Sequence, residues 1–202
     1  MKAINYLFFF LLIGNAHKIN SQDILDAYII KLNGDSVQGS VKLPGSKLWG
    51  MNVYARLGDG IDFSEKGKQG SFVFYEPKQI KEFGYYAAKN RTSPVRYVSE
   101  TVYKSKRLVI IEIDGPLRLY KDATLQMIDR NTANVDYYYI KKKNDRLFII
   151  EKTAYYKVKK RDSLKEYLAD CPEVTEILND KNELDLAVLV KKYNDWYERT
   201  SQ

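Results

Sequence analysis

Histidine and cysteine are almost missing from this chain, which has one of each among 202 residues. The histidine, His17, lies in or beside an N-terminal segment that we expect to be removed, and the cysteine is Cys171. One cysteine cannot form an internal disulfide, so we expect Cys171 to be a small buried hydrophobic residue. Without histidine, the chain has no Ser-His-Asp or Cys-His catalytic group and no ordinary histidine and cysteine site for zinc. The chemistries that remain are those of carboxylates, lysine and tyrosine, or binding without catalysis.

A hydrophobic run long enough to span a membrane is also missing. The longest run, residues 6–13, follows Lys2 and precedes a polar segment, and it falls well short of the ~20 residues that a membrane helix needs. A positive start, a short apolar run and a small-residue exit are the parts of a secretory signal peptide. We therefore expect residues 1–21 to be a signal peptide, cut after Ala16 or after Ser21, with Ser21 favoured. Neither site is followed by a cysteine, which excludes a lipid anchor there.

Short strands separated by turns dominate the chain from residue 26 to residue 160. Asn33-Gly34 stands between two such runs, and this pair is a strong hairpin signal because both turn positions need positive φ. Residues 107–113 are apolar on both faces, as in a central strand, and Asp114-Gly115 turns the chain back. We count nine or ten strands, joined mostly by short turns. This pattern predicts an antiparallel sandwich or a partly open barrel, which forms a β domain over residues 22–160.

The hydrophobic period changes after Arg161. Asp162-Ser163, Pro172 and Asn182 are each typical of a helix start. The third helix has an apolar stripe at three- and four-residue spacing, made by Leu186, Leu189, Val190, Tyr193 and Tyr197. Such a stripe usually packs on the protein's own sheet, and a surface for a partner is the other interpretation. We therefore expect an α+β protein, mainly β, with three C-terminal helices over residues 161–202 packed on the β domain.

Turn, strand and helix features follow one another in a definite order along the chain. They are Asn33-Gly34-Asp35 with Gly39; Pro77, Ile80, Phe83 and Gly84; Gly115 with Leu117, Leu119 and Tyr120; Leu168, Asp170, Cys171 and Pro172; and Leu189, Val190, Tyr193 and Asn194. In this order they resemble an uncharacterised family of exported Gram-negative envelope proteins, in which a β module with a short helical tail often stands before an outer-membrane β-barrel. The sequence departs from that pattern because no barrel segment follows the helices. The resemblance implies export and architecture, and it implies no activity.

Basic side chains follow tyrosines at two places near the end of the β region. Lys141-Lys142-Lys143 comes after a run that includes Tyr137 and Tyr139, and a second basic run comes after Tyr155-Tyr156. Tyrosine rings can stack on sugar faces while lysines bind anionic groups. The candidate binding residues are therefore Tyr137, Tyr139, Lys141, Lys142 and Lys143. The other interpretation is structural, since tyrosine is a good strand residue and lysine at edges and turns discourages aggregation.

Glu112 is the candidate for catalysis. It shares a strand face with Leu108 and Ile110, and partial burial there would suit a general acid, with Glu100 or Glu151 as its partner across the sheet. Glu112 also lies close to a hairpin turn, where it would be solvated instead. A single carboxylate in this setting is weak support for catalysis.

Oxygen ligands suited to calcium occur at two places along the chain. Asp59 and Asp62 flank Gly60, and Asp180 stands near Asn182. Neither segment has the D-x-[DN]-x-[DN]-G spacing of a calcium loop, so we interpret them as turn and helix-cap residues. We expect no metal and no cofactor.

The charge balance and the missing catalytic groups favour binding over catalysis. The net charge of +7 is a modest basic excess, which permits binding to acidic polymers without requiring it. We expect a non-enzymatic module of the cell envelope, periplasmic or outer-membrane associated, that contacts another envelope protein or an anionic glycan and no nucleic acid. The alternative is a carboxylate-dependent hydrolase of cell-wall or polysaccharide substrates. Such an enzyme should show two carboxylates about 5–10 Å apart in a cleft.

Overall fold

The computed structural model describes residues 24–43, 57–68, 70–87, 93–128, 131–143, 145–150, 161–179 and 184–201. Within these ranges, residues 123–128 and 131–135 are described by their backbone alone. Several parts of the sequence predictions lie outside the described residues: the signal peptide, Glu151, Tyr155-Tyr156 with the basic run that follows, Asp180 and Asn182. The signal peptide and the division into a β domain and a helical segment stay predictions.

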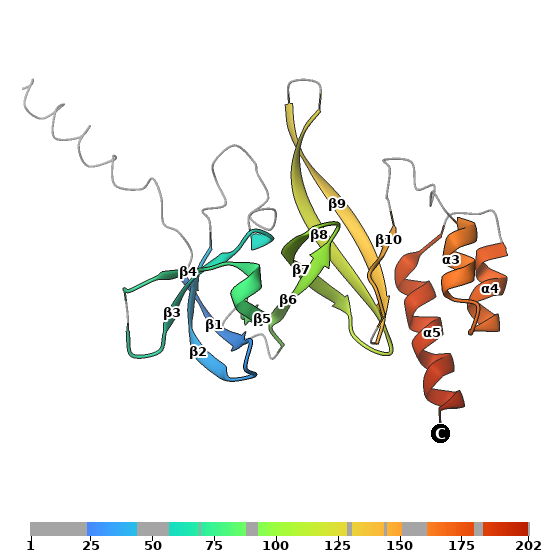
Figure 1. Cartoon of the computed structure of the whole chain (residues 1–202), viewed down its shortest axis with the longest axis horizontal. Coiled ribbons are helices and arrows are strands. Elements are labelled where there is room, and N and C mark those ends of the chain that lie inside the picture. Colours follow the sequence, from blue (N-terminus) through green and yellow to red (C-terminus); the bar gives the residue numbers. More distant parts are fainter. Residues whose placement is uncertain are drawn as a thin grey trace, which may run out of the picture.

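Ten antiparallel strands and three helices make up the described chain. The strands are β1 (Ile24–Lys31), β2 (Ser36–Lys42), β3 (Ile61–Glu65), β4 (Val73–Tyr75), β5 (Ile80–Tyr85), β6 (Val95–Val102), β7 (Ser105–Ile113), β8 (Leu117–Ile128), β9 (Asn131–Lys142) and β10 (Phe148–Ile150). The helices are α3 (Arg161–Tyr167), α4 (Pro172–Asn179) and α5 (Leu186–Thr200), and a short 3-10 helix, η2 (Pro77–Gln79), precedes β5. All ten strands lie in one open sheet, in the order β10-β9-β8-β7-β6-β5-β1-β2-β3-β4 (Figure 1). The expected fold class is confirmed.

Tight turns join most neighbouring strands. The turn expected at Asn33-Gly34 is present, but only Gly34 has a positive φ (+98°), so the expectation of positive φ at both positions is wrong. Between β1 and β2, Gly34 N donates to Lys31 O at 2.9 Å, and Asn33 Oδ1 accepts from Asp35 N at 3.1 Å. The chain then passes through β3 and β4 and returns to the other edge of β1, where β5 pairs with it. From β5 onward each strand pairs with the next along the chain, which places the helices at the far end of the sheet from β4 (Figure 1).

The first half of the sheet curls around a core of its own. The buried residues of this core are Ala27, Ile29, Val41, Leu43, Leu57, Ile61, Phe63, Ile80, Phe83, Tyr85, Tyr97 and Leu108. Although β3 and β7 are far apart in the strand order, Leu108 N of β7 donates to Gly58 O, just before β3, at 2.9 Å. This contact across the curl brings β7 next to the segment that precedes β3, within a sheet that stays open.

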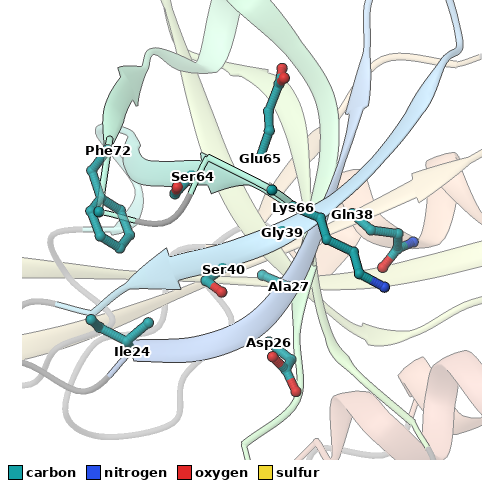
Figure 2. A pocket seen from close by; sticks show the side chains of 12 residues that line it. Ile24, Asp26, Ala27, Gln38, Gly39, Ser40, Ser64, Glu65, Lys66 and Phe72 are labelled. Carbon is teal, nitrogen blue, oxygen red and sulfur yellow. The ribbon is translucent and has the colours of Figure 1, made fainter.

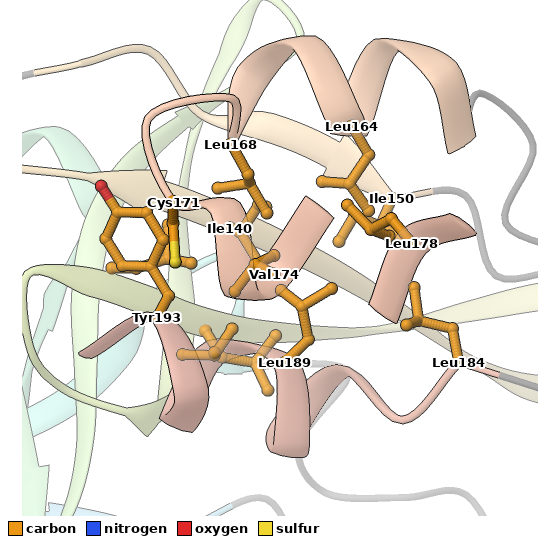
Figure 3. Close-up of a cluster of buried hydrophobic side chains, with 13 residues drawn as sticks. Ile140, Ile150, Leu164, Leu168, Cys171, Val174, Leu178, Leu184, Leu189 and Tyr193 are labelled. Atoms are coloured by element: carbon orange, nitrogen blue, oxygen red, sulfur yellow. The ribbon is translucent and has the colours of Figure 1, made fainter. Parts of the chain in front are cut away.

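The three helices cover one face at the other end of the sheet (Figure 3). Their core with β8, β9 and β10 consists of Leu117, Leu119, Ile140, Ile150, Leu164, Leu168, Cys171, Val174, Leu178, Leu184, Leu189, Val190 and Tyr193. Most of the predicted stripe of α5 is therefore buried on the sheet, whereas Tyr197 at its end is 43% exposed. Cys171 is fully buried, as expected of a small hydrophobic residue.

Two helix starts differ from the expected ones. Asp185 caps α5, because its carboxylate accepts from Ala187 N at 2.8 Å and from Val188 N at 3.2 Å. The prediction of a cap at Asn182 is therefore wrong. Helix α3 already begins at Arg161, before the expected cap at Asp162-Ser163, so Asp162 lies in its first turn, where a carboxylate still interacts favourably with the helix dipole.

Candidate functional site

The three consecutive lysines do not form one patch. Alternate residues of a strand point to opposite faces, so Lys141 and Lys142 of β9 face opposite ways. Lys141 Nζ lies 2.8 and 2.9 Å from the two carboxylate oxygens of Glu100. Lys142 Nζ lies 2.7 Å from Asp170 Oδ1, on the face that the helices cover. Lys143 follows the end of β9, is exposed, and has no ion-pair partner among the described residues. Of the three, Lys143 is therefore the one whose charge is free for a ligand.

The candidate tyrosines lie on the Lys141 face of β9, and their rings are largely covered. Tyr139 is 1% exposed and packs in a cluster with Val109 and Tyr120. Burial raises the pKa of Tyr139 above its ordinary value. Tyr137 is half-buried at the border of the same cluster. The prediction that Tyr139 stacks on a ligand is wrong, because its ring does not reach solvent.

A groove of about 670 Å³ opens where α5 meets the turn between β7 and β8 and the end of β9. Its lining residues are Asp114, Gly115, Pro116, Arg118, Lys142, Lys143, Asp170, Tyr193 and Tyr197. We call it the helix–sheet groove. Two of the five candidate binding residues, Lys142 and Lys143, lie here, and the other three do not. The groove adds two tyrosines of the helix to the lysines that the sequence singled out.

A contact between a side chain and the backbone holds α5 at the groove. Asn194, which is 8% exposed, accepts from Leu117 N at 2.8 Å and donates to Leu117 O at 3.0 Å. It thereby pairs both backbone groups at the start of β8, as a neighbouring strand would. Gly115 lies beside this amide: a Cβ there would be 2.5 Å from Asn194 Nδ2, and its φ of +155° is one that side chains rarely adopt. These three residues and Tyr193 all belong to the set quoted for the family resemblance, and they meet here.

The floor of the helix–sheet groove is a closed polar cluster around Lys142. Its Nζ lies 5.0 Å from the centre of the Tyr167 ring and 5.5 Å from that of Tyr193, while Tyr193 OH donates to Asp170 Oδ2 at 2.6 Å. Burial opposes ionisation of Asp170, but the contacts with Lys142 and Tyr193 outweigh it and hold its pKa below the usual value. Burial, followed by the hydrogen bond to Asp170, raises the pKa of Tyr193, and burial raises the pKa of Tyr167 to about 12. At neutral pH the lysine and the carboxylate therefore neutralise each other.

The rim of the groove has the charge and the ring surface that remain for a ligand. Arg118 belongs to the lining, but it lies opposite Lys141 in the pairing of β8 with β9, so its side chain points to the face that the helices do not cover, where Arg118 Nε pairs with Asp114 Oδ1 at 2.7 Å. Lys143 lies in the rim, and the exposed ring of Tyr197 stacks beside Tyr193 with their centres 6.5 Å apart. Three basic and two acidic side chains line the groove, a balance of one positive charge. The groove is therefore suited to an anion with an apolar face.

Glu112 does not have the surroundings of a catalytic acid. A bulge between Ile111 and Ile113 interrupts the alternation of β7, and Glu112 lies in this bulge with its side chain exposed. Of the two surroundings considered for Glu112, partial burial and solvation near the hairpin turn, the structure has the solvated one. Its proposed partner Glu100 lies opposite Arg107, five residues before Glu112. Five extended residues span roughly 16 Å, beyond the separation of about 5–10 Å that a pair of glycosidase carboxylates needs.

A buried carboxylate does occur in the sheet, and a guanidinium neutralises it. Arg107 Nε and Nη2 donate to the two oxygens of Asp122 at 2.7 and 3.1 Å, and Arg107 Nη1 donates to Asp59 Oδ1 at 2.7 Å. Burial raises the pKa of Asp122, although the contacts with Arg107 act in the opposite direction. Of the two aspartates near Gly60 considered as calcium ligands, Asp59 is therefore paired with Arg107, and Asp62 is exposed on β3. Within the described ranges, no group of three or more His, Cys, Asp or Glu side chains gathers to hold a metal ion.

Reasoning from the sequence missed seven residues of the groove, among them Arg118, Asp170, Tyr193 and Tyr197. A signal existed for the two tyrosines, whose four-residue spacing puts them on one helix face, but it indicated packing alone. Arg118 and Asp170 had no such signal, because their neighbours come from other segments of the chain. Their place in the groove follows from how α5 and the turn before α4 meet the sheet.

Comparison with known proteins gives no relative for this chain. No family model matches it, and neither the curated proteins nor the solved structures include a significant match. In the part of the chain that is described, none of the helices has the length and apolar character needed to cross a membrane. The function is therefore inferred from the chemistry of the helix–sheet groove.

Proposed function

We propose that this chain is a non-enzymatic binding module of the cell envelope that holds an anionic glycan in the helix–sheet groove. The observation that carries the proposal is the exposed cation of Lys143, in the same groove as the exposed ring of Tyr197 and a floor whose charges are already neutralised. The envelope location rests on the expected signal peptide.

An acidic sugar offers the two surfaces that this rim would bind. Its carboxylate would accept a charge-assisted hydrogen bond from the exposed ammonium of Lys143. The apolar face of the sugar ring would lie on the ring of Tyr197. Because Lys142 and Asp170 form an ion pair at 2.7 Å, the floor would neither repel the carboxylate nor hold it as a bare cation would.

The groove is formed before any ligand arrives, which favours binding. The hydrogen bonds of Asn194 to Leu117 hold α5 in place, and the two rings around Lys142 hold the floor. Little side-chain freedom is lost on binding when the site is rigid, so even a few contacts give useful affinity. A polymer with many acidic sugars would raise the overall affinity further, because it offers several units that can bind.

Titration calorimetry with trigalacturonate, a short acidic glycan, tests this proposal. We expect binding that weakens as salt rises, because exposed charges are screened. Lys143→Ser should weaken it by about three- to tenfold and Tyr197→Ala by a similar factor, as expected for one exposed charge pair and one ring contact. The matched control is Lys191→Ser, which removes the same charge from an exposed position of α5 outside the groove lining.

The outcomes separate the ligand classes. Trigalacturonate that does not bind, or that binds Lys143→Ser and Tyr197→Ala as well as the unchanged protein, contradicts the proposal. If triglutamate binds in the groove and trigalacturonate does not, the ligand is an acidic segment of another envelope protein and the glycan assignment is wrong.

A further inference from the structure

A second hollow, of about 650 Å³, lies at the other end of the sheet, on the outer face of β1, β2 and β3 (Figure 2). Its lining residues are Ile24, Asp26, Ala27, Gln38, Gly39, Ser40, Ser64, Glu65, Lys66, Gly67, Gly70 and Phe72. We call it the three-strand hollow. It shares no lining residue with the helix–sheet groove, so a ligand bound in the hollow would be independent of one bound in the groove.

Three hydrogen-bonding side chains form a row across the floor of this hollow. Asp26 lies opposite Ser40 in the pairing of β1 with β2, and Ser40 lies opposite Ser64 in the pairing of β2 with β3. Residues directly opposite in antiparallel strands point to the same face, about 5 Å apart. Gly39 permits the close approach of β3, since a Cβ there would lie 2.0 Å from Ser64 O. A carboxylate and two hydroxyls are therefore aligned, but Ser64 is buried and its hydroxyl donates to Lys68 O at 2.8 Å, so Asp26 and Ser40 are the members of the row that remain for a ligand.

The charges of the hollow balance, and its carboxylate is free. Neither Asp26 nor Lys66 has an ion-pair partner among the residues that the structure describes. Glu65 pairs with Lys68 at 3.0 Å and with Lys31 at 3.5 Å, and the contacts with Lys68 come first among those that hold the pKa of Glu65 below its usual value. The lining residues thus supply one free anion and one free cation, and Lys42, which is not among them, has its Nζ 5.8 Å from the centre of the Phe72 ring.

Apolar surface borders one side of the row. Figure 2 shows Phe72 and Ile24 on the same side of Ser40, with Gln38 and Lys66 on the other side. Ile24 is 57% exposed and Phe72 is half-buried, so both offer apolar surface to a ligand. Between them the hollow offers an aromatic ring, an aliphatic side chain, an amide and the polar row.

We propose that the three-strand hollow binds an uncharged saccharide. Sugars combine an apolar C–H face with pairs of neighbouring hydroxyls, and they need no compensating charge. The ring of Phe72 and the side chain of Ile24 would contact the C–H face. The free carboxylate of Asp26 would accept hydrogen bonds from two neighbouring hydroxyls, which is the stronger, charge-assisted kind of bond. Ser40 and Gln38 would supply further donors and acceptors, as in other pockets where a few polar groups fix orientation.

Ligand-observed NMR with four uncharged trisaccharides tests this inference on the full chain as exported: maltotriose, cellotriose, mannotriose and triacetylchitotriose. We expect at least one to bind, and we expect Asp26→Ala and Phe72→Ala each to weaken it about tenfold or more. The matched controls are Asp195→Ala and Phe74→Ala, which remove the same side chains from exposed positions outside the hollow. Both controls should keep the affinity of the unchanged protein.

Testing each variant with the ligand of the other site distinguishes the two sites. Lys143→Ser should leave binding of the uncharged sugar intact, and Asp26→Ala should leave binding of trigalacturonate intact. If none of the four sugars binds, or if Asp26→Ala and Phe72→Ala bind as well as the controls do, the inference is overturned while the groove proposal stands. If the uncharged sugar is lost in Lys143→Ser and kept in Asp26→Ala, the sugar belongs in the helix–sheet groove and the hollow is not a saccharide site.

Discussion

Replacing Asn194 by alanine should test how firmly α5 is attached to the sheet. The amide of Asn194 makes both of its hydrogen bonds, at 2.8 and 3.0 Å, to the backbone of Leu117, which is fully buried. Alanine leaves a buried N–H and a buried C=O without these partners. Each unpaired buried group costs about 1–3 kcal/mol, so the free energy of unfolding should fall by about 2–6 kcal/mol. That is a large share of the roughly 5–15 kcal/mol by which a domain is stable.

Urea denaturation followed by tryptophan fluorescence measures this loss. Trp196 lies two residues after Asn194 and packs at the border of the helical core, so its emission reports on the docking of α5. Asp195→Ala is the control, since it changes the exposed neighbour and should stay within about 0.5 kcal/mol of the unchanged protein. A loss below about 0.5 kcal/mol for Asn194→Ala would mean that water replaces the amide, and the attachment would then not depend on it.

Gly115→Ala provides a second arm of the same test. The added Cβ would lie 2.5 Å from Asn194 Nδ2, so it should push the amide away from Leu117 in addition to straining its own backbone. Part of the cost should disappear when Asn194 is already alanine. A double-mutant cycle that finds the two costs additive would refute the claim that the glycine is needed for the amide contact.

Three further predictions concern the helical core, the buried ion pair and the N-terminus. Leu189→Ala, in the core under α5, should cost about 2–5 kcal/mol by urea denaturation, and a cost below about 0.5 kcal/mol would mean that the helix is not packed there. Arg107→Met should cost about 3–5 kcal/mol because it leaves Asp122 buried without its cation. In this variant the pKa of Asp122 in the folded protein, which is already raised, would rise further, so the folded form would bind a proton more tightly. The variant should therefore regain stability as pH falls from 7 towards 4, and a cost that does not change with pH would contradict this reasoning. Mass spectrometry of the exported protein should find an N-terminus between residues 17 and 23, and an intact Met1 would refute the signal peptide.

The fold could be predicted where local chemistry decides it. Asn33-Gly34 and Asp114-Gly115 mark turns because of the backbone angles they allow, and the spacing of Leu189, Val190 and Tyr193 marks a buried helix face. These features were enough for the strand count, the antiparallel sheet and the C-terminal helices. The curl of the sheet could not be predicted, because it depends on contacts such as that of Leu108 with Gly58, which join distant segments.

The candidate site was predicted only in part, and the reasons are physical. The alternation of a strand was enough to separate Lys141 from Lys142, but treating the lysines as one unit overlooked it. The strand face of Glu112 could not be predicted, because a bulge interrupts the alternation of β7 and no residue type in the sequence predicts that bulge. Asn194 and Leu117 are 77 residues apart, so their contact, and with it the helix–sheet groove, is visible only in the folded chain.

Mapping of backbone amide chemical shifts during a titration with trigalacturonate tests the proposed glycan site most directly. We predict that the largest changes occur in the helix–sheet groove, at Gly115, Lys143 and Tyr197, and that they shrink as salt is raised. Shift changes confined to other parts of the chain, or none at millimolar ligand, would contradict the proposal.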